Sequence, residues 1–158
     1  MKQSELITAA LKGDATLVVK NARVVNVFTN EILEGDVALS EDTIIGVGKG
    51  FAAREEIDAG GAYLCPGFID AHVHIESSMV IPDSFSRVIM PHGTTTIIAD
   101  PHEIANVCGV AGVRAIYKLS DDLPLRVLFM MPSCVPATPF ENSGATLTAE
   151  DMEQFMRK

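Results

Sequence analysis

The second half of the sequence alternates short apolar runs with helix-like stretches, and this alternation limits the fold more than any other feature. The apolar runs are FIDAHVH (68–74), TTTIIAD (94–100) and LRVLFMM (125–131). Helical signals occupy residues 81–93, 109–122 and 148–158, and the last of these opens with a Thr-x-x-acid cap. Strands that alternate with helices and lack a polar face are typical of a parallel sheet buried on both sides. We therefore predict an α/β fold for residues 66–158.

The first part of the sequence has a different texture. β-branched runs such as TLVVKN and DTIIGVG are separated by Asn, Gly and Asp, which predicts a small antiparallel sheet over residues 16–65. The stretch ELITAAL has helical apolar spacing, so residues 1–15 are expected to form an N-terminal helix. Cys65-Pro66-Gly67 ends the strand pattern sharply and predicts a boundary before the β/α units.

The strongest chemical signal is Asp70-Ala71-His72-Val73-His74, at the end of an apolar strand. Alternate residues of a strand share one face, so the two imidazoles should lie about 6–7 Å apart along the chain, within reach of one metal ion. Asp70 lies on the same face and could orient an imidazole. An arbitrary His-x-His is more often a pair of surface histidines. Here the strand is otherwise apolar, where unpaired polar groups are costly, so a metal site is favoured.

A second polar group follows the next strand, at Asp100, His102 and Glu103. In parallel α/β folds this edge of the sheet is where ligands bind. A helix cap explains Asp100 equally well, because an acid before Pro101 is a common helix start. Glu76 follows the histidine pair, and its position beside that pair makes it a candidate that faces the site. Cys134 and Glu141 lie after the third strand, but no neighbouring motif activates either one.

Charge and cysteine content exclude several classes of protein. The formal net charge of −9 repels phosphate backbones and anionic lipid, so we expect neither a nucleic-acid nor a membrane partner. A free nucleobase carries no phosphate and is not excluded. The three cysteines form no CxxC pair, which argues against a disulfide framework or a zinc ribbon. With neither a signal peptide nor an apolar run of about 18 residues, the expected location is the cytoplasm.

The number of β/α units is small for a complete fold of this type. A (β/α)₈ barrel usually takes about 250 residues. The last helical stretch also runs to Lys158 without a stop signal. We therefore expect the sequence to be the N-terminal part of a longer polypeptide.

The stretch PGFIDAHVHIESSM, with PHGTTTIIADPHEIANV and PSCVPA in order after it, resembles the adenine deaminase family of the amidohydrolase superfamily. The resemblance implies a metal-dependent TIM-type barrel, here its first three β/α units, beside a small β-sandwich. It implies hydrolysis of adenine to hypoxanthine and ammonia at a binuclear centre of Mn²⁺, with Fe²⁺ or Zn²⁺ as alternatives. His72 and His74 match the first metal-binding pair, and Asp100, His102 and Glu103 match a motif that faces the site. The acid/base carboxylate is expected beyond residue 158, and a homodimer is considered for the full-length protein.

Two other functions compete with this interpretation. Another amidohydrolase that acts on cyclic amides, of the dihydroorotase type, would share the same strand histidines. A non-catalytic scaffold chain would retain the fold and lose the ligands. Since His72 and His74 are both present, the sequence favours part of an enzyme.

Overall fold

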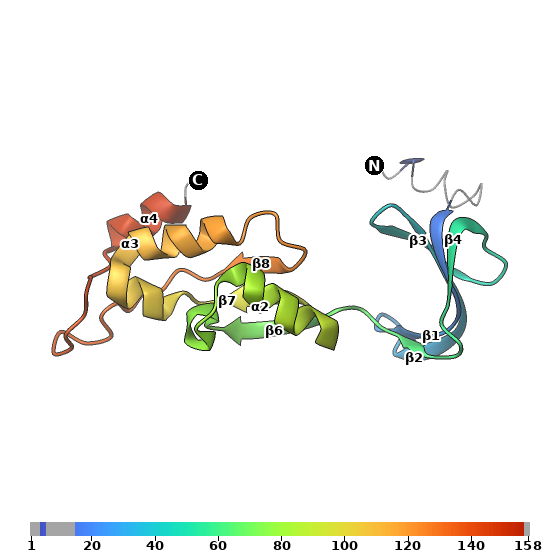
Figure 1. Cartoon of the computed structure of the whole chain (residues 1–158), viewed down its shortest axis with the longest axis horizontal. Helices are drawn as coiled ribbons and strands as arrows, with labels where there is room; N and C mark the ends of the chain where they lie inside the picture. Colours follow the sequence, from blue (N-terminus) through green and yellow to red (C-terminus); the bar gives the residue numbers. More distant parts are fainter. Residues whose placement is uncertain (1–3, 6–14, 157–158) are drawn as a thin grey trace. The chain divides into compact units, whose positions relative to one another are not determined.

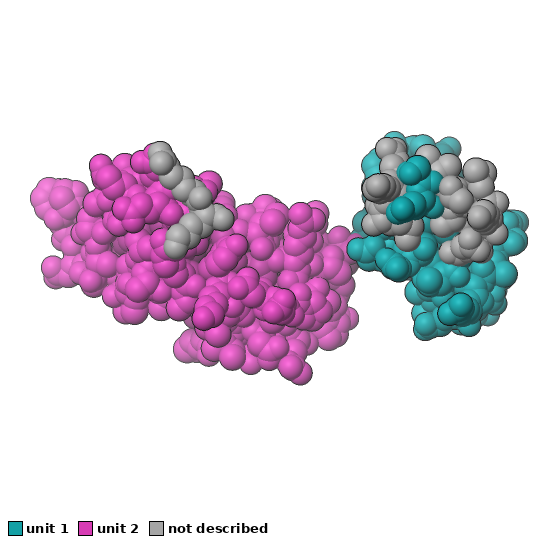
Figure 2. Space-filling view, turned by 90° about the horizontal axis from the view of Figure 1, so that it is seen from above, with its two compact units in different colours: residues 1–66 teal, residues 67–158 magenta. Residues whose placement is uncertain are grey.

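The computed structural model of the chain describes residues 4, 5 and 15–156. Its internal contacts divide the chain into two compact units, residues 1–66 and residues 67–158, which are coloured separately in Figure 2. Each unit contains its own sheet. The helix expected over residues 1–15 lies almost wholly outside the described residues.

The first unit is a five-stranded sheet in which β1 is the longest strand (Figure 1). Its strands are β1 (Ala15–Asn26), β2 (Glu31–Ser40), β3 (Thr43–Gly48), β4 (Ala53–Asp58) and β5 (Tyr63–Leu64). The order is β3-β2-β1-β4, and β5 also pairs with β1. The pairs β1–β2 and β2–β3 are antiparallel, but β4 and β5 lie parallel to β1. The purely antiparallel sheet predicted from the sequence is therefore wrong, because turn residues show where a strand ends and not which strand comes next to it.

An interruption in β1 joins three strands of this sheet. The register shifts between Val19 and Ala22, and Asn21 has a left-handed φ of 55°. The Asn21 backbone N–H donates to Oδ1 of Asp36 at 3.1 Å, and its side-chain amide donates to Oδ1 of Asp58 at 3.0 Å. Asp36 is buried, so the first bond satisfies a carboxylate that would otherwise be costly to bury.

The second unit is a parallel sheet of three strands in the order β6-β7-β8. The strands are β6 (Phe68–Val73), β7 (Thr94–Ala99) and β8 (Arg126–Phe129). The helices are α2 (Pro82–Ile89), α3 (His102–Leu119) and α4 (Ala149–Met156), with short 3₁₀ turns η1 (Ile75–Ser78) and η2 (Met90–His92). The predicted alternation of strand and helix is present in full. At the start of α4, Thr148 and Asp151 form the expected cap, since each backbone N–H bonds to the other's side chain.

The core of the second unit forms around the central strand. Ile97 and Ala99 of β7 are buried with Ile75 and Leu125, and Phe85 packs against them from α2. A second cluster joins α3 to the segment after β8 and to α4: Ala105, Val113, Val135, Leu147 and Phe155.

The outer strand β6 is not covered in the described chain. Phe68 is 58% exposed and Ile69 is 66% exposed. In the described chain the expected burial on both faces is found on one face of β7 only, at Ile97 and Ala99, and is absent at β6. An apolar strand shows that burial is needed, but it does not supply the covering segment.

Two glycines set the approach to this sheet. A Cβ at Gly67 would collide with the side chain of Thr95, so the entry to β6 needs a residue without one. Gly93, with a φ of +97°, provides the left-handed turn that leads into β7.

Helix α3 begins seven residues before the stretch that sequence periodicity indicated, at His102 instead of Gly109. Gly109 has a non-helical φ of 60° and ψ of −151° within the helix. This kink explains why the periodic pattern becomes recognisable only beyond it. Among the described residues, no helix is both long enough and apolar enough to cross a membrane.

Candidate metal centre

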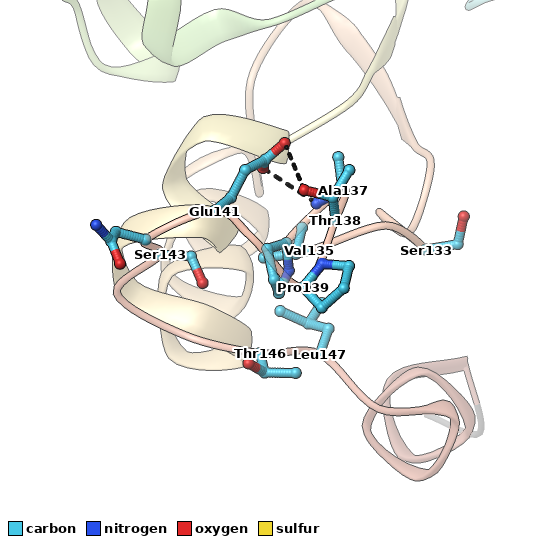
Figure 3. A pocket seen from close by; sticks show the side chains of 11 residues that line it. Ser133, Val135, Ala137, Thr138, Pro139, Glu141, Ser143, Thr146 and Leu147 are labelled. Atoms are coloured by element: carbon cyan, nitrogen blue, oxygen red, sulfur yellow. Dashed lines mark hydrogen bonds between the residues drawn. The ribbon is translucent and has the colours of Figure 1, made fainter.

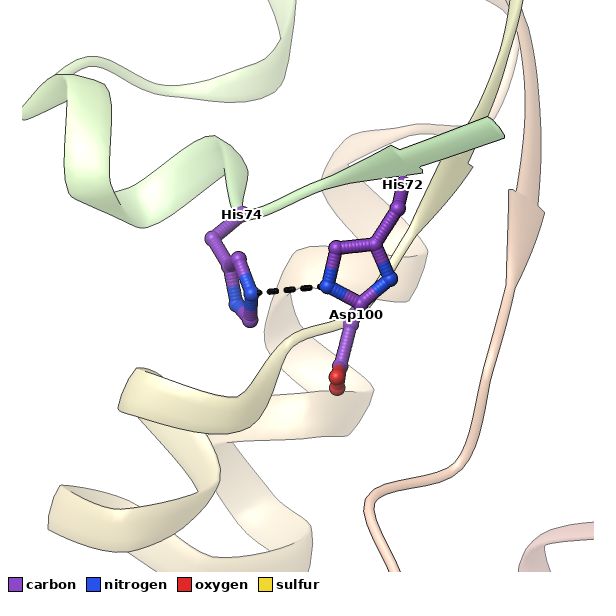
Figure 4. A group of neighbouring side chains, drawn as sticks. All are labelled: His72, His74 and Asp100. Atoms are coloured by element: carbon purple, nitrogen blue, oxygen red, sulfur yellow. Dashed lines mark hydrogen bonds between the residues drawn. The ribbon is translucent and has the colours of Figure 1, made fainter. Parts of the chain in front are cut away.

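His72 and His74 lie together at the carboxyl end of β6 (Figure 4). His72 is within the strand, and His74 follows it in an extended conformation. Their Nε2 atoms are 3.1 Å apart, and the ring planes meet at 75°. The alternation of a strand thus brings two imidazole nitrogens to one point, as the sequence predicted.

Asp100 joins the histidine pair from the end of the neighbouring strand. Its backbone N–H donates to the carbonyl of Val73 at 2.8 Å, which holds the end of β7 beside the end of β6. One ligand atom from each of His72, His74 and Asp100 lies within 4.8 Å of the others. Figure 4 shows the carboxylate of Asp100 beside the two rings.

The carboxylate of Asp100 does not cap α3. The residue at the cap position is Pro101, and no side chain bonds there. Oδ1 of Asp100 is buried, and within the described chain it has no hydrogen-bond partner. The capping interpretation of Asp100 is therefore wrong. A buried acceptor without a partner is costly, and a cation is one way to satisfy it.

The spacing of the two imidazole nitrogens fits a single divalent cation. Two nitrogens that each lie about 2.0–2.1 Å from an ion stand roughly 2.9–3.4 Å apart at coordination angles between about 90° and 109°. The observed separation of 3.1 Å lies in that interval. The donor set combines two imidazole nitrogens with a carboxylate oxygen, a combination that suits zinc and other divalent transition metals.

Glu103 and Ser77 lie next to His74. Nδ1 of His74 is 2.8 Å from Oε2 of Glu103, at ion-pair distance, although the contact lacks the alignment of a hydrogen bond and Nδ1 has no other partner in the described chain. The Ser77 hydroxyl donates to Oε1 of Glu103 at 2.8 Å. Burial raises the pKa of Glu103, but the Ser77 hydrogen bond, a backbone N–H and His74 outweigh it and hold that pKa below its ordinary value.

Glu76 has a different role from its neighbours. Its Oε1 accepts a hydrogen bond from the backbone N–H of Ile104 at 3.1 Å. This N–H belongs to the first turn of α3, where backbone donors lack partners within the helix. Glu76 thus supplies the side-chain bond that the sequence-based argument assigned to Asp100.

Asp70 and His102, like Glu76 and Glu103, lie outside the cluster of donors. Oδ1 of Asp70 accepts from the backbone N–H of His72 at 3.1 Å, and this is the hydrogen bond that the described chain shows for its side chain. A side chain two residues away on the same strand bends back more readily onto the local backbone than onto a ring. His102 opens α3, and no contact between its side chain and His72, His74 or Asp100 is found in the described chain.

The loop after β8 forms a cavity of its own (Figure 3). Its volume is about 610 Å³, and its lining comes from residues 133–147. Glu141 accepts a hydrogen bond from the backbone N–H of Ala137 at 3.3 Å and so closes the loop. Cys134 is exposed. None of His72, His74 and Asp100 lines this cavity, and we attach no chemistry to it.

The sequence is similar to that of a known family over most of its length. A model of the amidohydrolase family matches residues 63–158. The chain is 55% identical over 143 residues to the adenine deaminase of Clostridium acetobutylicum. This alignment covers 90% of this chain and 25% of that protein. It is 52% identical over 152 residues to the adenine deaminase of Geobacillus kaustophilus, with 96% and 26% covered. The chain therefore spans about a quarter of the length of the curated relatives it matches.

Solved structures show the same fold at low sequence identity. N-acyl-D-glutamate deacylase from Bordetella bronchiseptica, complexed with zinc, matches with a TM-score of 0.61 and 17% identity, covering 91% of this chain and 35% of that one. D-hydantoinase from a Thermus species matches with a TM-score of 0.60 and 20% identity, covering 89% and 37%. At these identities the likeness concerns the fold alone.

Proposed function

Because the chain belongs to the amidohydrolase family, we propose that it carries the first metal-binding part of an adenine deaminase, an enzyme that hydrolyses adenine to hypoxanthine and ammonia. The observation that carries the proposal is the cluster of His72, His74 and Asp100, in which a buried carboxylate oxygen has no partner within the described chain. The substrate is inferred from the relatives, since adenine deaminases are about half identical to this chain over nearly its whole length.

The fold of the second unit supports this proposal. Its parallel order β6-β7-β8 is what the first three strands of a (β/α)₈ barrel would form. Such a barrel places its active site at the carboxyl ends of the strands, where His74 and Asp100 follow β6 and β7. The first unit would form one sheet of a small β-sandwich. Its exposed apolar side chains, such as Ile44 and Ile57, would be covered by the other sheet of that sandwich, from outside residues 1–158.

His72, His74 and Asp100 are the residues that would hold the ion. A divalent cation at this position would supply acidity to bound water, because it lowers the pKa of that water towards neutrality. The two rings would bind the ion through Nε2, since the strand geometry of β6 brings these two nitrogens within 3.1 Å of each other. Asp100 contributes negative charge from the adjacent strand, which favours a cation at this point.

The identity of the metal follows from the donors only within limits. Two imidazoles and a carboxylate, without thiolate, suit Mn²⁺, Fe²⁺ and Zn²⁺ alike. We propose Mn²⁺, with Fe²⁺ and Zn²⁺ as alternatives, in a binuclear centre whose other ligands lie outside residues 1–158. We expect the acid that protonates the departing amine to lie outside residues 1–158 as well.

The charge of the chain supports a neutral substrate. A formal charge of −9 disfavours a phosphorylated nucleotide, whereas free adenine carries no phosphate. A non-catalytic scaffold role is less well supported, because a scaffold does not need two ring nitrogens 3.1 Å apart.

The test is ammonia release by the intact protein loaded with Mn²⁺ and supplied with adenine. We expect hypoxanthine and ammonia in equal amounts, and no turnover after His72→Ala. Arg87→Ala is a matched control, because Arg87 pairs with Asp83 on the exposed surface of α2. Turnover of dihydroorotate without turnover of adenine would instead assign the chain to a cyclic-amide hydrolase.

A further inference from the structure

Ser77, Glu103 and His74 form a continuous line of polar contacts beside the candidate metal centre. The Ser77 hydroxyl donates to Oε1 of Glu103 at 2.8 Å, and Oε2 of the same carboxylate faces Nδ1 of His74 at 2.8 Å. Ser77 belongs to η1 and Glu103 to the first turn of α3. Two segments that are 26 residues apart in the sequence thus meet at one imidazole.

The chemistry of this line fixes which nitrogen of His74 carries the proton. A carboxylate oxygen only accepts, so a proton on Nδ1 makes this contact attractive, although its alignment is not that of a hydrogen bond. If Nδ1 were bare, its lone pair would face a carboxylate oxygen 2.8 Å away, and the two would repel each other. With the proton on Nδ1, Nε2 keeps its lone pair, and Nε2 is the atom that faces His72 at 3.1 Å.

Ser77 is needed because Glu103 is not held by burial. The side chain of Glu103 is 48% exposed, so a free carboxylate would turn into solvent. The Ser77 hydroxyl occupies Oε1 and leaves Oε2 directed at His74. Nδ1 of His74 is itself buried and has no hydrogen bond to another group in the described chain, so Glu103 is the acceptor available to it.

We propose that Glu103 is a positioning residue, held by Ser77, which sets the Nδ1–H tautomer of His74 and so directs the lone pair of Nε2 at the cation. This inference rests on the proposed metal site, but it concerns the state of His74 before any ion binds. Carboxylates that accept the second N–H of a ligand histidine fix its orientation and raise its basicity. Their removal typically lowers metal affinity by about 10–100-fold.

Glu76 provides a comparison that separates a positioning role of Glu103 from a purely structural one. Glu76 joins the same two segments through its bond to the Ile104 N–H but does not touch His74 in the described contacts. If Ser77 and Glu103 served only to hold η1 against α3, loss of Glu76 would have the same effect on His74 as loss of Glu103.

The experiment measures two properties of the intact protein, the dissociation constant for Zn²⁺ and the tautomer of His74. Zinc binding is followed by competition with a chelating dye. The tautomer is read from the ¹⁵N resonances of histidine side chains in metal-free protein, with His74 identified by the signal lost in His74→Ala. For Glu103→Ala we expect a 10–100-fold weaker zinc affinity and loss of the Nδ1–H signature. Ser77→Ala should weaken the zinc affinity and the Nδ1–H signature by a smaller factor. Ser77→Thr, which keeps the hydroxyl, should retain the wild-type values of both.

The outcomes separate this inference from the proposed function. If His74→Ala loses zinc while Glu103→Ala retains wild-type affinity and tautomer, the positioning role is wrong and the metal site stands. If His74→Ala binds zinc as well as the wild-type protein, the metal site itself is wrong, and the positioning role with it. Glu76→Ala should lower the unfolding midpoint and retain the Nδ1–H signature. Loss of the signature in Glu76→Ala would reduce Glu103 to a structural contact.

Discussion

The carboxylate of Glu76 accepts a hydrogen bond from the backbone N–H of Ile104 at 3.1 Å, across 28 residues of sequence. This bond joins the segment after β6 to the first turn of α3. Asp100, the acid next to the helix start, is thereby released from capping and lies beside His72 and His74 instead. The structure thus divides two tasks between two carboxylates, one that holds the helix and one that faces the imidazoles.

The cap leads to a first prediction. Glu76→Ala should lower the free energy of unfolding by about 1 kcal/mol, the usual loss when a side-chain cap of a helix is removed. The measurement is the midpoint of urea unfolding of the intact protein. Glu55→Ala, on the exposed strand β4, is the control and should shift the midpoint by less than about 0.5 kcal/mol equivalent. Equal shifts for the two variants would mean that Glu76 does not stabilise α3.

Asp100 gives a second prediction, with opposite signs in two conditions. In metal-free protein, Asp100→Asn should leave stability unchanged or raise it, because it removes the charge of a half-buried carboxylate whose Oδ1 has no partner within the described chain. With Mn²⁺ or Zn²⁺ present, the same variant should bind the ion at least about ten-fold more weakly and lose the stabilisation that binding gives.

The measurement is thermal unfolding with and without a chelator, together with the metal content of the purified protein. Asp70→Asn is the matched control, since Asp70 bonds to the backbone of His72 and lies outside the cluster of donors. Equal metal content in Asp100→Asn and wild-type protein would remove Asp100 from the site.

Much of the second unit could be predicted from the sequence because its signals are local. Apolar runs between turn residues placed β6 and β7 within one residue of their observed ends, and the helical signal from residue 81 begins one residue before α2. The parallel pairing of β4 with β1 could not be predicted, since it depends on contacts between residues nearly 40 apart. The same limit applied to the site. His72 and His74 share a strand and were found by their spacing.

Whether Asp100 caps a helix or faces the site could not be decided from a local pattern. An acid before a proline is equally typical of a helix cap and of a ligand at a sheet edge. The choice depends on whether another group satisfies the helix, and that group is Glu76. Ser77 lies in the polar stretch after the histidine pair, but a serine in a loop becomes informative only when its acceptor, Glu103, is known.

A third prediction concerns pH and the first unit. A hydrogen bond from the Asn21 side chain, and a second from the Gly60 N–H, hold the pKa of Asp58 below its ordinary value. When the pKa of a carboxyl is lower in the folded state than in the unfolded state, the carboxyl stabilises the fold at any pH above its unfolded-state pKa. This stabilisation is lost as the pH falls through the folded-state pKa. Stability should therefore decrease at acidic pH, partly through Asp58.

The variant that tests this is Asn21→Gly, which removes the amide and tolerates the left-handed φ of 55°. The pKa of Asp58, followed through its carboxyl ¹³C shift, should move up towards the ordinary value. The acid dependence of unfolding should become weaker in the same variant. An unchanged titration of Asp58 would show that Asn21 is not what lowers its pKa.

The last prediction concerns residues 1–158 expressed alone. We expect this polypeptide to self-associate and to show no turnover of adenine. In the second unit β6 and β8 are both edges of the described sheet, and an edge presents unpaired N–H and C=O groups. Phe68 and Ile69 make the β6 edge apolar as well as open. Two imidazoles and one carboxylate also provide ligands for one divalent ion at most, whereas a binuclear centre holds two.

The measurements are light scattering, metal content after dialysis and ammonia release from adenine. Ile69→Lys tests the cause of association, because a charge on an edge strand opposes edge-to-edge pairing. This variant should raise the soluble fraction of the isolated polypeptide and leave it inactive, since it supplies no ligand. A monodisperse, metal-loaded polypeptide with repeated turnover would contradict the prediction. It would mean that His72, His74 and Asp100 suffice for the chemistry, or that a second copy of the chain completes the centre.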